Sequence, residues 1–128
     1  MKNILIVDDD EMIRITLAEL LKQQDSSLTI MNAGNGRQAI ETLETTRVDL
    51  VITDMKMPVM DGLQLLAYTA KKHPELPAIV MTGLMDEKTY EKLNVLGIRS
   101  YMTKPFSFED LAEKIYACKR DTFHPMCK

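Results

Sequence analysis

VITDMKMPVMDG, residues 51–62, is the stretch on which the fold assignment depends. It opens with an apolar, partly β-branched run that ends in Thr53 and Asp54, and after a proline-containing loop it closes on Asp61 and Gly62. A short run of this kind is typical of a buried strand, and Asp-Gly before periodic leucines is typical of a turn that opens a helix. The stretch predicts a strand, a loop and a helix, with an acidic residue at the end of the strand.

Apolar runs of the same kind occur four more times along the chain. Longer amphipathic stretches separate them, which is the pattern of buried parallel strands joined by helices. The five predicted strands, including the one just described, are residues 4–7, 28–31, 50–53, 78–82 and 100–103.

Apolar residues at helical spacing predict a helix after each strand. Gly97 would stop the fourth helix, which runs from about Asp86 to Leu96, and the Ser107 hydroxyl would cap the fifth with Asp110 three residues on. The apolar stripes expected to face the sheet are, in chain order, Ile13, Leu17, Leu20 and Leu21; Ile40 and Leu43; Leu63, Leu66, Ala67 and Ala70; Tyr90, Leu93 and Leu96; and Phe108, Leu111, Ile115 and Cys118.

Strict alternation of strands and helices implies right-handed crossovers and a sheet that is covered on both faces. The predicted fold class is therefore α/β, with a doubly wound five-stranded parallel sheet. At 128 residues and 45% hydrophobic content, the chain has room for one such domain. We assign residues 1–120 to the domain and interpret residues 121–128 as a C-terminal tail or the start of a linker.

The 16 basic and 19 acidic residues, for a net charge of -3, are interspersed and form no basic block of the kind that binds nucleic acid or lipid headgroups. Binding to nucleic acid or to a membrane surface is therefore disfavoured. The apolar residues 4–7 are far fewer than the roughly 20 of a bilayer span, so a cytoplasmic protein is expected. Cys118 and Cys127 are not expected to form a disulfide.

Acids, a hydroxyl and a lysine stand at the ends of the predicted strands. Asp8 and Asp9 follow the first strand, Asp54 follows the third, Thr82 ends the fourth, and Lys104 follows the fifth. In open α/β sheets the ligand crevice lies outside the carboxyl ends of the strands, so these side chains are expected to converge there. Such a set of groups is suited to phosphoryl transfer.

The carboxylates of Asp8, Asp9 and Asp54 would repel one another in a shared crevice, and a hard cation with oxygen ligands, such as Mg²⁺, would relieve that repulsion. Asp54, at the end of a buried strand, is the expected nucleophile, because a carboxylate can form an aspartyl phosphate. Asp8 and Asp9 would hold the metal. Lys104 and Thr82 would offset the charge on the phosphoryl oxygens.

Each of these residues also has a simpler interpretation. Asp9, Asp10 and Glu11 could merely cap the first helix and interact favourably with its dipole. Asp54, taken alone, would more often be a solvated acid in a loop. Only the ordered combination along the chain favours a phosphoryl-transfer site.

Four motifs carry a family resemblance, namely ILIVDDD (residues 4–10), VITDMKMPVMDG (51–62), VMTG (80–83) and YMTKPF (101–106). On these motifs the chain resembles the receiver domains of two-component response regulators, of the chemotaxis-type single-domain kind, over about residues 1–120. The resemblance implies the flavodoxin-like fold of five β-α units.

By this resemblance Asp54 is the phosphoacceptor, and Asp8, Asp9, Asp54 and the backbone carbonyl of Lys56 bind Mg²⁺ or Mn²⁺. Lys104 would pair with the phosphoryl oxygens. The Lys104-Pro105 bond would be the cis peptide of the family.

The resemblance further implies that Thr82 is the switch hydroxyl and Tyr101 the aromatic switch, so that the surface of the fourth helix, fifth strand and fifth helix changes on phosphorylation. Tyr101 could equally be a half-exposed strand aromatic. The residues at 97–100, together with Lys56 and Leu84, depart from the usual family pattern and leave the phosphate lifetime open.

A receiver domain implies partners rather than a conventional enzyme, since it catalyses only its own phosphorylation and dephosphorylation. The phosphoryl donor would be a sensor histidine kinase or a histidine phosphotransfer protein, and a downstream protein target would read the changed surface. The resemblance also admits a phosphorylation-dependent homodimer.

Two other functions compete with this interpretation. A phosphatase of the haloacid-dehalogenase type also uses an aspartyl nucleophile, but it needs a second acid where this chain has Lys56. A pseudo-receiver that acts as a protein-interaction module without phosphorylation would be favoured if Asp8, Asp9, Asp54 or Lys104 were missing, and all four are present.

Overall fold

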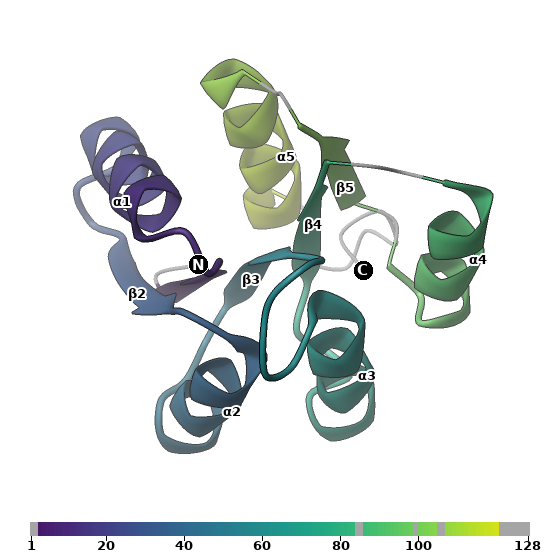
Figure 1. Ribbon diagram of the computed structural model, residues 1–128. Helices are drawn as coiled ribbons and strands as arrows, with labels where there is room; N and C mark the ends of the chain where they lie inside the picture. The colour runs from purple at the N-terminus through teal and green to yellow at the C-terminus, as the bar shows by residue number, and fades with distance from the viewer. Residues whose placement is uncertain (1–2, 84–85, 99, 105–106, 121–128) are drawn as a thin grey trace.

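The computed structural model describes residues 3–83, 86–98, 100–104 and 107–120 (Figure 1). Strands and helices alternate throughout, so the predicted α/β class is confirmed. In chain order the elements are β1 (Asn3–Val7), α1 (Glu11–Gln24), β2 (Thr29–Ala33), α2 (Gly36–Thr45), β3 (Leu50–Asp54), α3 (Gly62–Lys72), β4 (Ala78–Thr82), α4 (Glu87–Val95), β5 (Ser100–Thr103) and α5 (Phe108–Arg120).

The five strands form one parallel sheet in the order β2-β1-β3-β4-β5. Figure 1 shows α1 and α5 on one face of this sheet and α2, α3 and α4 on the other. The doubly wound sheet predicted from the alternation of elements is therefore confirmed. Parallel strands end at a common edge, so all the strand-end residues singled out above lie at one end of the molecule.

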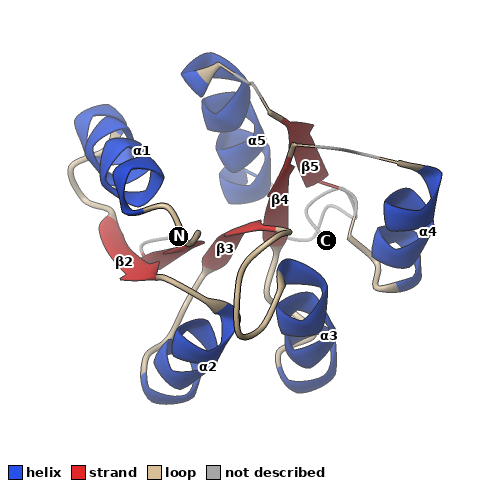
Figure 2. Ribbon diagram, in the orientation of Figure 1, coloured by secondary structure: helices blue, strands red, loops and turns tan. Residues whose placement is uncertain are grey.

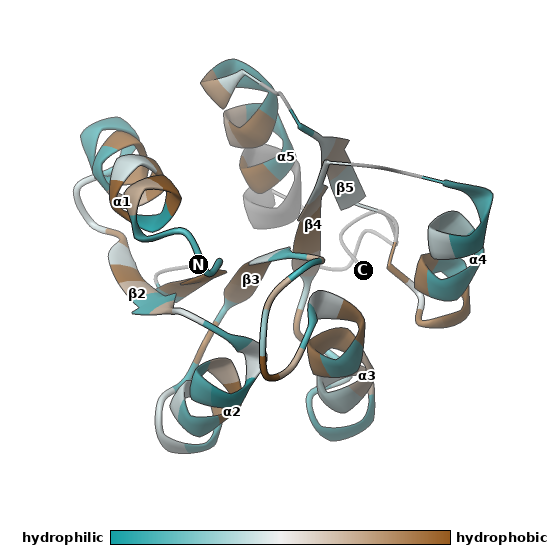
Figure 3. Ribbon diagram, viewed as in Figure 1, coloured by the Kyte–Doolittle hydropathy of each residue, from teal (hydrophilic) through white to brown (hydrophobic). Residues whose placement is uncertain are grey.

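Two hydrophobic cores lie on the two faces of the sheet because alternate strand residues point to opposite sides. In β1, Ile4 and Ile6 pack towards α1 and α5, whereas Leu5 and Val7 pack towards α2, α3 and α4. Figure 3 shows the strands mostly in the hydrophobic colour, while each helix carries both hydrophobic and hydrophilic residues. This two-sided burial explains why the strands read as continuous apolar runs.

Helix N-caps at the same edge set where four of the helices begin. The side chains of Asp10, Asn35, Asp61 and Asp86 each accept a hydrogen bond from a backbone N–H in the first turn of α1, α2, α3 and α4. The predicted cap of α5 is confirmed, since the backbone N–H of Asp110 donates to Ser107 Oγ at 3.1 Å.

The predictions for the second strand and for the apolar stripe of α3 were partly wrong. The second strand lies at Thr29–Ala33 rather than 28–31, because its last residues continue the ladder with β1 although Asn32 is polar. In α3, Ala67 and Ala70 are exposed, whereas Leu65, Leu66 and Thr69 are buried.

The close approach of Gly62 to β3 sets the phase of α3. A Cβ atom on Gly62 would lie 2.8 Å from Met55 Cα and would clash with the Asp54 carbonyl oxygen. The Gly62 N–H also donates to the Met55 carbonyl at 2.9 Å. The start of α3 is therefore pressed against the end of β3, and this contact decides which leucines face the sheet.

In α4, Leu93 is buried and Leu96 is partly buried, as predicted, but Tyr90 is 42% exposed. The predictions for Pro105, the side chain of Cys118, Cys127 and residues 121–128 lie outside the described residues. Within the described part of the chain, no helix combines the length and the apolar character that crossing a lipid bilayer requires.

Candidate functional site

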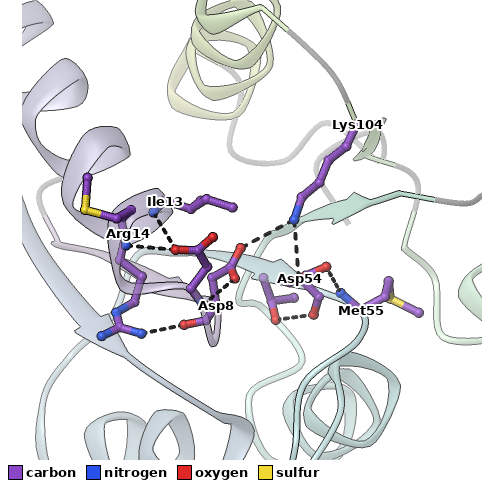
Figure 4. Close-up of polar contacts among 9 residues, drawn as sticks. Asp8, Ile13, Arg14, Asp54, Met55 and Lys104 are labelled. Atoms are coloured by element: carbon purple, nitrogen blue, oxygen red, sulfur yellow. Dashed lines mark hydrogen bonds and ion pairs between the residues drawn. The ribbon is translucent and has the colours of Figure 1, made fainter.

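The carboxyl ends of β1, β3, β4 and β5 bring the predicted site residues together. Asp8 directly follows β1, Asp54 ends β3, Thr82 ends β4, and Lys104 directly follows β5. Because β3 lies between β1 and β4, Asp54 occupies the centre of the group. Figure 4 shows the side chains of Asp8, Asp54 and Lys104 pointing towards one another.

Three carboxylates converge at this edge. Asp8, Asp9 and Asp54 each offer one oxygen, and these oxygens all lie within 4.8 Å of one another. Asp8 and Asp54 are buried, whereas Asp9 is exposed. The predicted convergence of the three acids is confirmed.

The donor set fits a hard divalent cation. Asp8 Oδ2 is buried and has no hydrogen-bond partner among the described residues. A buried carboxylate oxygen without a hydrogen-bond donor is costly, and a divalent cation beside it would offset that cost in addition to the ion pair with Lys104 Nζ at 3.5 Å. Mg²⁺ binds oxygen ligands in proteins, usually one or two carboxylates together with waters and phosphate oxygens.

Three hydrogen bonds hold Asp8, two at its main chain and one at its carboxylate. Its N–H donates to the Ala33 carbonyl at 3.1 Å, and its carbonyl accepts from Arg14 Nη1 at 2.6 Å. Its other carboxylate oxygen, Oδ1, accepts from the Asp10 N–H at 2.9 Å (Figure 4). Only Oδ2 is left facing the acid cluster.

The carboxylate of Asp54 is oriented in the same manner. Its Oδ1 accepts a hydrogen bond from the Met55 N–H at 2.7 Å, and its Oδ2 accepts one from Lys104 Nζ at 3.3 Å. The Thr53 hydroxyl donates to the Asp54 carbonyl at 2.9 Å. One oxygen is thus fixed by the backbone and the other faces the crevice.

Lys104 is the cation of the site. Its Nζ lies 3.5 Å from Asp8 Oδ2, without hydrogen-bond geometry, and 3.3 Å from Asp54 Oδ2. Its backbone N–H donates to the Thr82 carbonyl at 2.6 Å, which fixes the start of the side chain beside β4. A single ammonium group therefore faces both buried carboxylates.

Burial raises the pKa of Asp8 above its ordinary value of 3.8, and the charges of Asp54 and Asp9 raise it further. The hydrogen bond from Asp10 and the charge of Lys104 act in the opposite direction without cancelling the rise. The ionised form of Asp8 is therefore disfavoured by its surroundings, and a bound cation would favour it.

The two predicted switch residues, Thr82 and Tyr101, lie on the opposite side of Asp54 from Asp8, on β4 and β5. Thr82 is buried at the end of β4, and Tyr101 is half-buried in β5. The ring of Tyr90 meets that of Tyr101 edge-on, with centroids 5.0 Å apart. The side chain of Lys56 is exposed two residues after Asp54, and the role of its carbonyl stays a prediction.

The simpler interpretation holds for two of the acids. Asp10 is the N-cap of α1 and Glu11 lies in its first turn, whereas Asp9 belongs to the acid cluster. Arg14 was missed by the sequence analysis. The sequence feature that could have drawn attention to Arg14 is its position close to the N-terminus of a predicted helix, where the helix dipole disfavours positive charge.

Comparison with known proteins points to one family. The response regulator receiver domain family matches residues 4–116. The transcriptional regulatory protein PdtaR of Mycobacterium tuberculosis is 35% identical over 114 residues, which are 89% of this chain and 55% of that protein. The positive alginate biosynthesis regulatory protein of Pseudomonas aeruginosa is 34% identical over 119 residues, 92% of this chain and 47% of that protein. The chain spans about half the length of these relatives.

Solved structures agree with this. A CheY-like response regulator receiver domain protein from Methanospirillum hungatei has a TM-score of 0.89 at 28% identity, covering 95% of this chain and 96% of that one. The response regulator protein TrrA from Thermotoga maritima, solved in complex with Mg(2+)-BeF, has a TM-score of 0.80 at 32% identity, covering 91% of this chain and 98% of that one.

Proposed function

This chain belongs to the response regulator receiver domain family of two-component signalling, and we propose that Asp54 is its phosphoacceptor. The observation that carries the proposal is the placement of Asp54 Oδ2. This oxygen lies 3.3 Å from Lys104 Nζ, and its carboxylate is within the cluster formed with Asp8 and Asp9. Its neighbour Oδ1 is held by a backbone N–H, so the reactive oxygen keeps one orientation.

In the proposed reaction Asp54 Oδ2 attacks phosphorus, a new O–P bond forms, and the bond between phosphorus and the donor breaks. Lys104 is placed to offset negative charge on the phosphoryl oxygens. Asp8, Asp9, Asp54 and the Lys56 carbonyl would hold Mg²⁺ or Mn²⁺, which when bound supplies positive charge to the phosphoryl group. Fixed orientation of the oxygen lowers the entropic cost of the attack.

The response to phosphorylation is proposed to run through Thr82 and Tyr101. Thr82 ends β4, the strand beside Asp54, and Tyr101 lies on β5 beside β4. A phosphoryl group that contacts Thr82 and Lys104 would favour one arrangement of this side over another and so shift a two-state equilibrium. The surface of α4, β5 and α5 would then change for a downstream protein target.

The proposed phosphoryl donor is a sensor histidine kinase or a histidine phosphotransfer protein in the cytoplasm. We propose residues 1–120 as the receiver domain and residues 121–128 as a tail or linker, since the chain spans about half of its curated relatives. A homodimer formed on phosphorylation is compatible with this scheme.

The test is the intact mass of the full chain after incubation with acetyl phosphate and Mg²⁺. We expect one phosphoryl adduct that is lost with EDTA and lost in Asp54→Asn. Asp49→Asn is the matched control, because Asp49 precedes the same strand at its opposite end. An adduct that persists in Asp54→Asn would place the acceptor elsewhere, and a folded wild type without an adduct would favour the pseudo-receiver.

A further inference from the structure

We propose that Arg14 is a positioning residue for the metal-holding turn between β1 and α1, and that it sustains cation affinity although it carries positive charge itself. The proposal deepens the function proposed above, because it concerns how Asp8 and Asp9 are held. Figure 4 shows the Arg14 side chain reaching from α1 to the main chain of Asp8, with its guanidinium group away from Lys104.

The hydrogen bond between Arg14 and Asp8 is short and lies on the side of Asp8 that faces away from the acid cluster. Arg14 Nη1 donates to the Asp8 carbonyl at 2.6 Å, whereas the carboxylate of Asp8 points towards Asp54 and Lys104. The β2–α2 turn bounds the guanidinium on its far side, since a Cβ on Gly34 would lie 3.4 Å from Arg14 Nη1. The guanidinium therefore lies between the turn after β1 and the turn after β2.

The Arg14 hydrogen bond completes the immobilisation of Asp8. The N–H and Oδ1 of Asp8 already have backbone partners in Ala33 and Asp10, so its carbonyl was the remaining polar group besides Oδ2. That carbonyl belongs to the peptide unit that joins Asp8 to Asp9. Fixing this peptide unit fixes the position of both acids relative to Asp54.

Charge alone cannot account for an arginine at this place. A cation near the N-terminus of α1 opposes the helix dipole, and a cation near the acid cluster repels a second cation. If Arg14 acted only through its charge, removing it would tighten metal binding. If Arg14 acts by positioning, removing it weakens metal binding, so the two roles predict opposite signs.

The experiment measures Mn²⁺ affinity of the full chain by electron paramagnetic resonance of the free ion, without a phosphoryl donor. We expect Arg14→Met to weaken Mn²⁺ binding about tenfold, the lower end of the range for residues that orient metal ligands. Arg14→Lys keeps the charge but not the planar fork and is expected to weaken binding as well. Arg47→Met is the control, since Arg47 is 88% exposed and pairs with Asp49 at the opposite edge.

Unchanged or tighter Mn²⁺ binding in Arg14→Met would overturn the proposal, as would full affinity in Arg14→Lys or absence of Mn²⁺ binding by the wild type. Urea unfolding of each metal-free variant identifies the folded fraction, and the affinities are compared for that fraction. If Arg14→Met does not fold, Arg14→Lys decides alone. A wild type that binds Mn²⁺ but acquires no phosphoryl adduct contradicts Asp54 as acceptor and leaves the Arg14 comparison valid.

Discussion

The two sides of the site differ in how firmly their residues are held. On the side of β1 and β3, the carboxylates of Asp8 and Asp54 are buried and each is fixed by a backbone N–H. The β3–α3 loop, tan in Figure 2, is closed by the Gly62 N–H bond to the Met55 carbonyl and anchored to the start of α2 by the Gly36 N–H bond to the Met60 carbonyl. Few arrangements other than the observed one are open to this side.

The side of α4 and β5 is more open. Tyr90 is 42% exposed and Val95 is 86% exposed on α4, while Tyr101 is half-buried. A Cβ on Gly83, directly after β4, would meet no atom of the described residues within 4 Å. Exposed positions of this kind are typical of segments that move in signalling, although Leu93 and Met102 of the same elements are buried.

One edge of the sheet therefore combines two different environments. The firmly held side keeps like charges close together, which requires a rigid frame. The proposed switch would need a second arrangement of the open side, where Tyr90 and Val95 are exposed.

Gly62→Ala is expected to destabilise the protein by about 3 kcal/mol, because the new Cβ would press on the backbone of Asp54 and Met55. Gly83→Ala is the matched variant on the open side and is expected to change the free energy of unfolding by less than about 0.5 kcal/mol. Urea unfolding of both variants measures the contrast. Equal effects would contradict the division into a firm and an open side.

Asp8→Asn is expected to stabilise the metal-free protein near neutral pH while weakening Mn²⁺ binding by at least about tenfold. Burial raises the pKa of Asp8, so the folded state binds its proton more tightly than the unfolded chain does. The wild-type free energy of unfolding therefore decreases as pH rises through this pKa, and the asparagine removes that decrease. Thermal unfolding against pH checks the sign.

Asp86→Asn is the control for that experiment, because the pKa of Asp86 is lowered whereas that of Asp8 is raised. The hydrogen bond from the Thr89 N–H lowers the pKa of Asp86, so its contribution to stability is present above pH 3.8 and is lost as pH falls through the lowered pKa. Asp86→Asn should therefore not stabilise the protein near neutral pH. Stabilisation by both variants would indicate an effect of net charge rather than of burial at Asp8.

The smallest expected effect concerns Tyr90→Phe. Burial, together with a hydrogen bond to Tyr90, raises the pKa of Tyr101 to about 12. Loss of the Tyr90 hydroxyl should lower the pKa of Tyr101 towards 10.0 without reaching it, because the burial remains. Tyrosinate absorbance during alkaline titration, with Tyr101→Phe to assign the signal, provides the measurement.

Tyr68→Phe serves as the control, since Tyr68 donates to Glu44 at 3.1 Å and does not belong to the Tyr90–Tyr101 pair. Because the pKa of Tyr101 is raised on folding, its contribution to stability should be lost as pH rises from 10.0 through about 12. An unchanged pKa of Tyr101 in Tyr90→Phe would show that the Tyr90 hydroxyl does not influence Tyr101.

Local residue patterns were sufficient for the sheet and for the convergence of the acids. The apolar runs required buried strands, and parallel strands necessarily end at one edge, so Asp8 and Asp54 had to lie near each other. Periodicity failed in α3, where the predicted stripe included Ala67 and Ala70, both exposed. The contact of Gly62 with the end of β3 sets the phase of that helix, and a pattern within one helix contains no information about it.

The α/β class, the element order and the side chains at the strand ends could all be predicted from the sequence, because each follows from residues close together in the chain. The arrangement of the elements in space was needed to show that, within the described residues, Asp8 Oδ2 has no hydrogen-bond partner, that the rings of Tyr90 and Tyr101 meet edge-on, and that Arg14 reaches the Asp8 carbonyl. These features depend on the distances and directions between elements. Packing of whole helices against the sheet sets them, and no local pattern encodes that packing.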